Sequence, residues 1–171
     1  MFSRNTLILV ALAAVASAQT SITLTNDCTY QVDPAFYPDA IASDGSATGG
    51  FPLAAGASAG VTLDPTYSGR IWGRTGCDSD GDCATGQCPG GENCTGPAAA
   101  GPTLAQFTLD GYDSLDFFNP STTDGFNVAI TITPGAGCSV GPQSCTADNE
   151  GTGCGDTSAC PTGTSYTVSF C

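Results

Sequence analysis

The side chains of this sequence that could take part in catalysis are almost all carboxylates. The chain has 171 residues, of which sixteen are Asp or Glu, and it contains no histidine and no lysine. Without these two residue types there is no Ser-His-Asp or Cys-His arrangement and no Schiff base. Carboxylate chemistry remains, as in glycoside hydrolysis, where one carboxyl group is the general acid and the other is the base or nucleophile. That reaction needs the carboxyl groups about 5–9.5 Å apart and one raised pKa.

The charge balance restricts the partners. A formal net charge of −13 repels phosphate backbones and anionic lipid surfaces, so we expect no nucleic-acid partner and no binding to anionic membranes. Neutral polysaccharides, cationic groups and other proteins remain. We expect no cofactor, because there is no phosphate-binding G-x-x-x-x-G-K loop. We also expect no zinc site, because the chain has no histidine and its N-terminus resembles an export signal. The acidic run from Asp78 to Asp82 resembles the start of a calcium loop, but Cys83 and Pro89 occupy the positions that need Gly and Glu.

The N-terminal segment predicts a signal peptide over residues 1–18. It carries one positive charge at Arg4, an apolar run over residues 7–15 and a small-residue cleavage site at Ala16-Ser17-Ala18. The apolar run is too short to cross a bilayer. We therefore expect residues 19–171 to form one domain of a secreted, monomeric protein located outside the cell or in the cell wall.

All ten cysteines lie within residues 19–171. An even number behind a signal peptide predicts five disulfides, although spacing alone does not choose among the possible pairings. Eight of them fall in residues 77–101 and 135–163, two polar, Gly-rich segments in which we expect no strands. Such segments bury little apolar area, so covalent links must hold their shape.

The elements between these segments predict an all-β fold. Short runs with alternating apolar residues, separated by Gly and Pro turns, predict strands at 21–25, 60–63, 69–75, 103–109, 127–133 and 166–170. Strands of this length and spacing are typical of a β-sandwich or flattened barrel, here of about ten strands. Within them, we expect Trp72 to lie in the core and Arg74 to have a structural role.

Several motifs, in order along the chain, resemble the thaumatin-like family. Residues 69–77 are similar to the pattern G-R-x-W-x-R-T-x-C, residues 103–107 to T-L-A-E-F, and residues 116–128 to D-F-Y-D followed by D-G-F-N-V. Residues 81–94 resemble the signature built on C-x-T-G-D-C, with Gln87 in place of its aspartate. The resemblance covers nearly all of residues 19–171.

The resemblance implies a disulfide pairing and a reduced shape. The implied pairs are Cys28–Cys171, Cys77–Cys83, Cys88–Cys94, Cys138–Cys160 and Cys145–Cys154. Larger members of the family carry sixteen cysteines and a second lobe that forms one wall of a cleft. This chain is similar to the small ten-cysteine subgroup, so we expect a much reduced second lobe and a shallow groove.

The family cleft is acidic; it binds β-1,3-glucan and in some members cleaves it. By motif, the implied ligand-binding residues are Arg70, Gln106, Asn119 and Asp124. Gln106 and Asn119 replace two of the family's carboxylates, and an amide can hydrogen-bond a sugar hydroxyl but cannot transfer a proton. The substitutions therefore favour binding over hydrolysis. A glucanase would need Asp124 together with Asp116 or Asp156 as its catalytic pair.

The leading functional expectation is a secreted thaumatin-like protein that binds cell-wall β-1,3-glucan through a shallow polar cleft, a property associated with antifungal action in this family. The alternatives are a weak endo-β-1,3-glucanase, an inhibitor of a secreted glycoside hydrolase, and a secreted effector with a protein partner. Exposed aromatic residues that could stack on sugar rings are Tyr112, Phe117 and Phe118. Asn93-Cys94-Thr95 is a sequon that predicts N-glycosylation of a glycoprotein.

Overall fold

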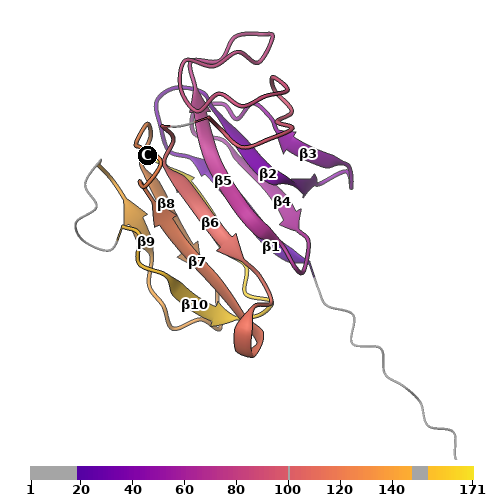
Figure 1. Ribbon diagram of the computed structural model, residues 1–171, viewed down its shortest axis with the longest axis vertical. Coiled ribbons are helices and arrows are strands. Elements are labelled where there is room, and N and C mark those ends of the chain that lie inside the picture. Colours follow the sequence, from indigo (N-terminus) through magenta and orange to yellow (C-terminus); the bar gives the residue numbers. More distant parts are fainter. Residues whose placement is uncertain (1–18, 100, 148–153) are drawn as a thin grey trace, which may run out of the picture.

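The computed structural model describes residues 19–99, 101–147 and 154–171, so the predicted signal peptide lies outside the described residues. Eleven strands and one short 3-10 turn, η1 (Tyr112–Ser114), make up this part of the chain (Figure 1). The strands are β1 (Thr20–Asn26), β2 (Val32–Ala42), β3 (Ala47–Gly50), β4 (Ser58–Leu63), β5 (Ser68–Thr75), β6 (Leu104–Thr108), β7 (Leu115–Ser121), β8 (Ile130–Pro134), β9 (Gln143–Cys145), β10 (Ser158–Pro161) and β11 (Tyr166–Phe170).

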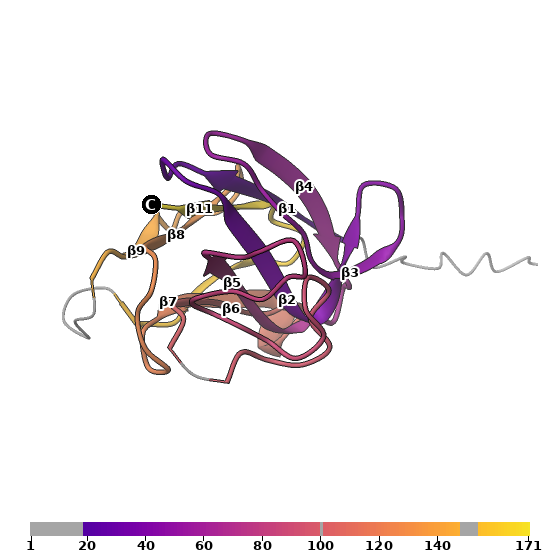
Figure 2. The same cartoon turned by 90° about the horizontal axis from the view of Figure 1, so that it is seen from above.

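All eleven strands belong to one sheet, in the order β10-β7-β6-β5-β2-β4-β1-β11-β8-β9, with β3 paired to β2. The pairing of β1 with β11 is parallel, so the first and last strands of the described chain lie side by side. Seen from above, the sheet curls until β8 and β11 lie across from β6 and β7 (Figure 2). The predicted all-β sandwich or flattened barrel is confirmed, in the form of a single curled sheet.

The main core fills the inside of the curl. Strands β1 and β11 alternate buried and more exposed residues, as the sequence pattern predicts. Phe107, Phe118 and Tyr166 pack together there, with ring centroids 5.2 to 6.3 Å apart. Phe118 is 1% exposed, so the expectation that it could stack on a sugar is wrong: it faces inward from β7.

The alternation of residues did not predict the strands β2, β3, β7, β9 and β10. Strands β2 and β7 contain prolines, which normally count against a central strand. Strand β2 has an irregular register and pairs with β5 along its first half but with β4 near its end, while the short β3 pairs only with β2. Strands β9 and β10 correct the expectation that residues 135–163 lack strands: each is a short segment with a disulfide-bonded cysteine at one edge of the sheet.

All ten cysteines are paired, and the pairs are those that the resemblance implies. Cys28–Cys171 joins the ends of the neighbouring strands β1 and β11. Cys77–Cys83 and Cys88–Cys94 both close short loops in the segment between β5 and β6. This segment, residues 76–103, is called the stapled loop below.

The stapled loop covers part of the outer face of the sheet. A second, smaller core forms beneath it from Trp72, Leu104, Ala35 and the Cys88–Cys94 disulfide. The indole Nε1 of Trp72 donates a hydrogen bond of 2.8 Å to the carbonyl oxygen of Gly86. Trp72 is therefore a core residue, as expected, although it lies on the face of the sheet opposite to the main core.

Arg74 fastens the stapled loop to the sheet. Its side chain is fully buried, and its guanidinium donates to the carbonyl oxygens of Asp33 and Gly91 at 3.2 and 2.8 Å. It also pairs with the Glu92 carboxylate at 2.6 Å. Desolvation raises the pKa of Glu92, while the positive charge of Arg74 opposes the rise. The structural role expected for Arg74 is confirmed.

Candidate functional site

Three neighbouring strands bring Arg70, Gln106 and Asn119 into one row. Arg70 on β5 lies directly opposite Gln106 on β6, and Gln106 lies opposite Asn119 on β7. Directly opposite residues of antiparallel strands project from the same face. The Asn119 amide Nδ2 donates to Gln106 Oε1 at 3.1 Å, so the two side-chain amides are in contact.

The row forms the floor of a shallow groove, a hollow of about 300 Å³. Ser68 and Thr108 also line it, and their hydroxyl oxygens are 3.4 Å apart. Neither residue was predicted from the sequence. Because side chains two positions apart share a face of a strand, the positions of Arg70 and Gln106 would have indicated both.

The groove begins where the cover of the stapled loop ends. Every second residue of β5 projects from the face that carries the groove, and these residues are Arg74, Trp72, Arg70 and Ser68. The first two are buried beneath the stapled loop, Arg70 is half-buried and Ser68 is exposed. The stapled loop therefore covers one part of this face and leaves the other part accessible to solvent and to a ligand.

Asp124 lies at the rim of the groove, in the turn between β7 and β8. Its carboxylate pairs with the Arg70 guanidinium at 3.3 Å, and its backbone carbonyl accepts a hydrogen bond from the Gly101 amide at 2.7 Å. The side chains of Arg70 and Asp124 are 35% and 46% exposed, so the pair contributes only about 0–1 kcal/mol to stability. The buried Tyr67 hydroxyl donates to the Arg70 carbonyl at 3.1 Å and fixes the strand there.

Asp116 does not join this site. It lies three residues before Asn119 on β7 and faces the opposite side of the sheet, where it is fully buried. Its carboxylate accepts hydrogen bonds from the Asp110 amide at 3.0 Å and the Tyr166 hydroxyl at 3.4 Å. Burial raises the pKa of Asp116, and these hydrogen bonds limit the rise.

Asp156 is exposed on the segment before β10 and is not among the residues that line the groove. The adjacent Gly155 amide bonds the carbonyl of Pro120 at the end of β7. The three candidate carboxylates therefore do not gather around Arg70: Asp124 is at the rim, Asp116 is inside the sheet, and Asp156 is outside the groove lining.

The buried carboxyl group of Asp116 predicts a pH dependence. Its folded-state pKa is raised, so its contribution to stability is complete below the unfolded pKa of about 3.9 and is lost as the pH rises through the folded pKa. An amide at this position does not titrate, so Asp116→Asn should become more stable relative to the wild type as the pH rises from about 3 to about 7. Urea unfolding at both pH values measures this difference.

Asp64 is a matched control with the opposite sign. The amide and hydroxyl of Thr66 lower the pKa of its exposed carboxylate. The wild type therefore gains stability from this group as the pH rises through the lowered pKa, and Asp64→Asn should lose stability relative to it over the same range. Relative stability of Asp116→Asn that stays flat or falls would contradict the assignment of a raised pKa to Asp116.

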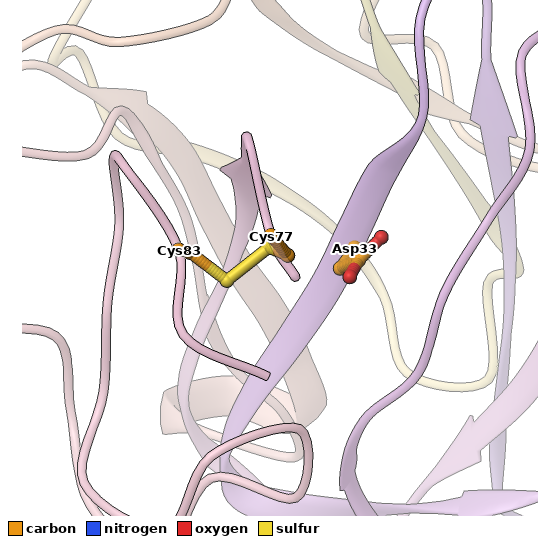
Figure 3. A group of neighbouring side chains, drawn as sticks. All are labelled: Asp33, Cys77 and Cys83. Atoms are coloured by element: carbon orange, nitrogen blue, oxygen red, sulfur yellow. A yellow bond between two sulfur atoms is a disulfide. The ribbon is translucent and has the colours of Figure 1, made fainter. Parts of the chain in front are cut away.

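One carboxylate and two cysteine side chains, residue types that can bind metals, lie close together where the stapled loop leaves β5. The ligand atoms of Asp33, Cys77 and Cys83 lie within 4.8 Å of one another (Figure 3). The two sulfur atoms are joined in a disulfide, so they are not the thiolates that metals bind. Asp33 is buried; Gln31 donates to its Oδ1 at 2.8 Å, and its Oδ2 has no hydrogen-bond partner among the described residues.

The remaining predicted positions lie around the groove or on the stapled loop. Phe117 is half-buried on the groove face, opposite Thr108, whereas Tyr112 is 87% exposed. Asn93 is exposed on the stapled loop, and its Oδ1 accepts a hydrogen bond from the Gly49 amide at 2.5 Å. Its glycosylation remains a prediction.

A curled, disulfide-linked sheet with a polar groove beside a cysteine-rich loop defines a class of small all-β proteins. Residues 26–167 match the model of the Thaumatin family, and the chain belongs to that family. It is 41% identical to zeamatin from Zea mays over 148 residues, which cover 82% of this chain and 61% of zeamatin. It is 36% identical to a thaumatin-like protein from Oryza sativa subsp. japonica over 96% of this chain and 92% of that protein.

The solved structure of the thaumatin-like xylanase inhibitor TLXI has the same fold. It superposes with a TM-score of 0.66 at 27% identity and covers 88% of this chain and 98% of that chain. The chain thus spans less than two thirds of the length of zeamatin, but almost all of the length of the Oryza sativa protein and of TLXI. No helix in residues 19–99, 101–147 or 154–171 is long and apolar enough to cross a membrane.

Proposed function

We propose that this protein is secreted and binds cell-wall polysaccharide, with β-1,3-glucan as the ligand, along the groove of β5, β6 and β7. The row of Arg70, Gln106 and Asn119 carries the proposal. Guanidinium and amide groups together provide several donors and acceptors on one open face, and the hydroxyls of Ser68 and Thr108 extend them. A neutral sugar chain presents hydroxyl groups, which can donate hydrogen bonds to and accept them from these side chains. Because the sugar carries no charge, it is not repelled by the negative protein.

The same geometry favours binding over hydrolysis. A glycosidase needs two carboxyl groups about 5–9.5 Å apart on either side of the scissile bond. Of the candidate carboxylates, Asp124 alone reaches the groove, and it is paired with Arg70. The amides of Gln106 and Asn119 do not titrate, so neither can act as a general acid or base. These observations count against the alternative of a weak endo-β-1,3-glucanase.

A groove variant tests the proposal. Gln106→Ala combined with Asn119→Ala should abolish retention on insoluble β-1,3-glucan between pH 4 and pH 7, because it removes the contacting pair of amides. Thr131→Ala with Ser144→Ala is a matched control, since it removes a polar cross-strand pair, 2.8 Å apart, on β8 and β9. Retention is measured by sedimentation with the polysaccharide. If the wild type is not retained at any of these pH values, the proposal fails.

Inhibition of a secreted glycoside hydrolase is a second candidate. It is supported by the shared fold with a protein described as a xylanase inhibitor, of which this chain matches nearly the whole length. Both arginines of the domain are engaged in ion pairs, so neither is a free cation for a carboxylate active site. A xylanase assay with added protein tests the candidate directly. Inhibition that survives in the groove variant would separate it from polysaccharide binding.

A further inference from the structure

Two carboxylates and one guanidinium meet where the stapled loop is fastened to the sheet. Arg74 on β5 donates to the Glu92 carboxylate at 2.6 Å and to the backbone carbonyl of Asp33 on β2 at 3.2 Å. The Asp33 side chain also faces Glu92, through its negative charge and at hydrogen-bonding range. When both carboxyl groups are ionised, two negative charges therefore share a single positive one.

One oxygen of Asp33 needs a hydrogen-bond donor. Asp33 is 1% exposed; Gln31 donates to its Oδ1 at 2.8 Å, but its Oδ2 has no partner in the part of the chain that the structure describes. A buried polar atom without a partner is costly. An ionised Glu92 carboxylate does not satisfy it, because both of its oxygens are acceptors. A protonated Glu92 has one O–H group to donate.

The surroundings of Glu92 leave it open to protonation. Among the described residues, Arg74 and Asp33 are the charged side chains that act on it. Strand β3 packs against it through Gly50, where an added Cβ atom would lie 2.7 Å from the Glu92 carbonyl oxygen, and β3 contains no charged residue. The Glu92 side chain is 34% exposed, so solvent can supply the proton. The other carboxylates of the stapled loop are exposed, and they are Asp78, Asp80 and Asp82.

We propose that one proton, shared between Glu92 and Asp33, fastens the stapled loop to β2 in mildly acidic solution. The protonated Glu92 carboxyl group donates to Asp33 Oδ2, while its other oxygen still accepts from Arg74. The three side chains then carry no net charge. When the proton leaves to solvent, Asp33 Oδ2 loses its donor and faces a second negative charge. The stapled loop is therefore held less firmly at neutral pH.

The direction of the pH dependence follows from the environment of Glu92. Desolvation raises the pKa of Glu92, the charge of Arg74 opposes the rise, and the charge of Asp33 adds to it. The stability that this group contributes is complete below its unfolded pKa of about 4.3, and it is lost as the pH rises through the folded pKa. Because the stapled loop covers Trp72 beside the groove, the pH sets how firmly this cover is held.

Hydrogen exchange at Trp72 tests the proposal, because its indole N–H donates to the carbonyl of Gly86 on the stapled loop at 2.8 Å. From about pH 4 to about pH 7, its protection, corrected for the intrinsic exchange rate, should fall about tenfold in the wild type, as expected for the loss of one charge-assisted hydrogen bond. In Glu92→Gln the amide is a donor at every pH, so protection should not change with pH. Asp33→Asn should behave in the same way, since its amide can donate to an ionised Glu92.

Asp116→Asn is the matched control. Asp116 also has a raised pKa, but it is buried beside Tyr166 in the main core, so this variant should keep the fall in Trp72 protection. Wild-type protection that is independent of pH, or a tenfold fall that persists in Glu92→Gln, would overturn the proposal. A fall that only Asp116→Asn removes would overturn it too, because the main core would then control the exchange. Near-ultraviolet circular dichroism verifies folding, and Glu92→Gln suffices for the test if Asp33→Asn does not fold.

Discussion

Arg74→Ala should lower the free energy of unfolding by about 3–5 kcal/mol, the range seen when one partner of a buried ion pair is removed. The guanidinium is fully buried and joins the carbonyl of Asp33 on β2 to Gly91 and Glu92 on the stapled loop. Without it, these groups lose their donors and the loop loses its main polar connection to the sheet. The stapled loop should then move away from Trp72, which is the only tryptophan in the chain.

Arg70→Ala is the matched control, on the same strand and the same face. Its ion pair with Asp124 is largely solvated, so the free energy of unfolding should change by less than about 1 kcal/mol. Its retention on β-1,3-glucan should nevertheless fall, since Arg70 belongs to the proposed binding row. Urea unfolding followed by Trp72 fluorescence measures the first effect, and sedimentation with the polysaccharide measures the second. Equal losses of stability in the two variants would contradict the different roles assigned to them.

Replacing Cys28 and Cys171 by serine should cost about 5 kcal/mol, from the entropy of the loop that this disulfide closes in the unfolded chain. The two cysteines are 143 positions apart, the largest separation of any pair. Their bond also holds the ends of β1 and β11, the first and last strands of the described chain, which pair in parallel. Pairing of such distant segments requires closure of a long loop before any contact is gained.

The pair Cys77 and Cys83 provides the comparison. These residues are 6 positions apart, so the same entropy argument gives about 2 kcal/mol for their replacement by serine. Urea unfolding of both double variants at one pH measures the difference. A larger loss from the short loop than from the long one would show that local packing around Asp33, rather than chain entropy, dominates the effect of these disulfides.

Three of the strands that the sequence predicted share one property. In β1, β8 and β11, apolar residues alternate with polar ones, because one face of each strand packs on the main core and the other is more exposed. Strand β7 gives no such signal, since its buried residues include Asp116 as well as Phe118. In β5, the buried run from Ile71 to Arg74 reflects two separate cores on opposite faces.

The sequence was sufficient to predict the all-β class, the number of disulfides and, through its motifs, the family and the groove residues Arg70, Gln106 and Asn119. These properties follow from residue types and local spacing. Only the tertiary structure decided that Asp116 and Asn119 face opposite sides of β7 and that Arg70, Gln106 and Asn119 form one row.

The tertiary structure also decided the different environments of the two arginines, which stand four positions apart in the same motif. The physical reason is that exposure of a sheet face depends on what folds over it, and alternation along a strand describes only which residues share a face. The stapled loop buries Arg74 and Trp72 and leaves Arg70 at the edge of its cover. The groove therefore exists because of a long-range contact that no local pattern in β5 encodes.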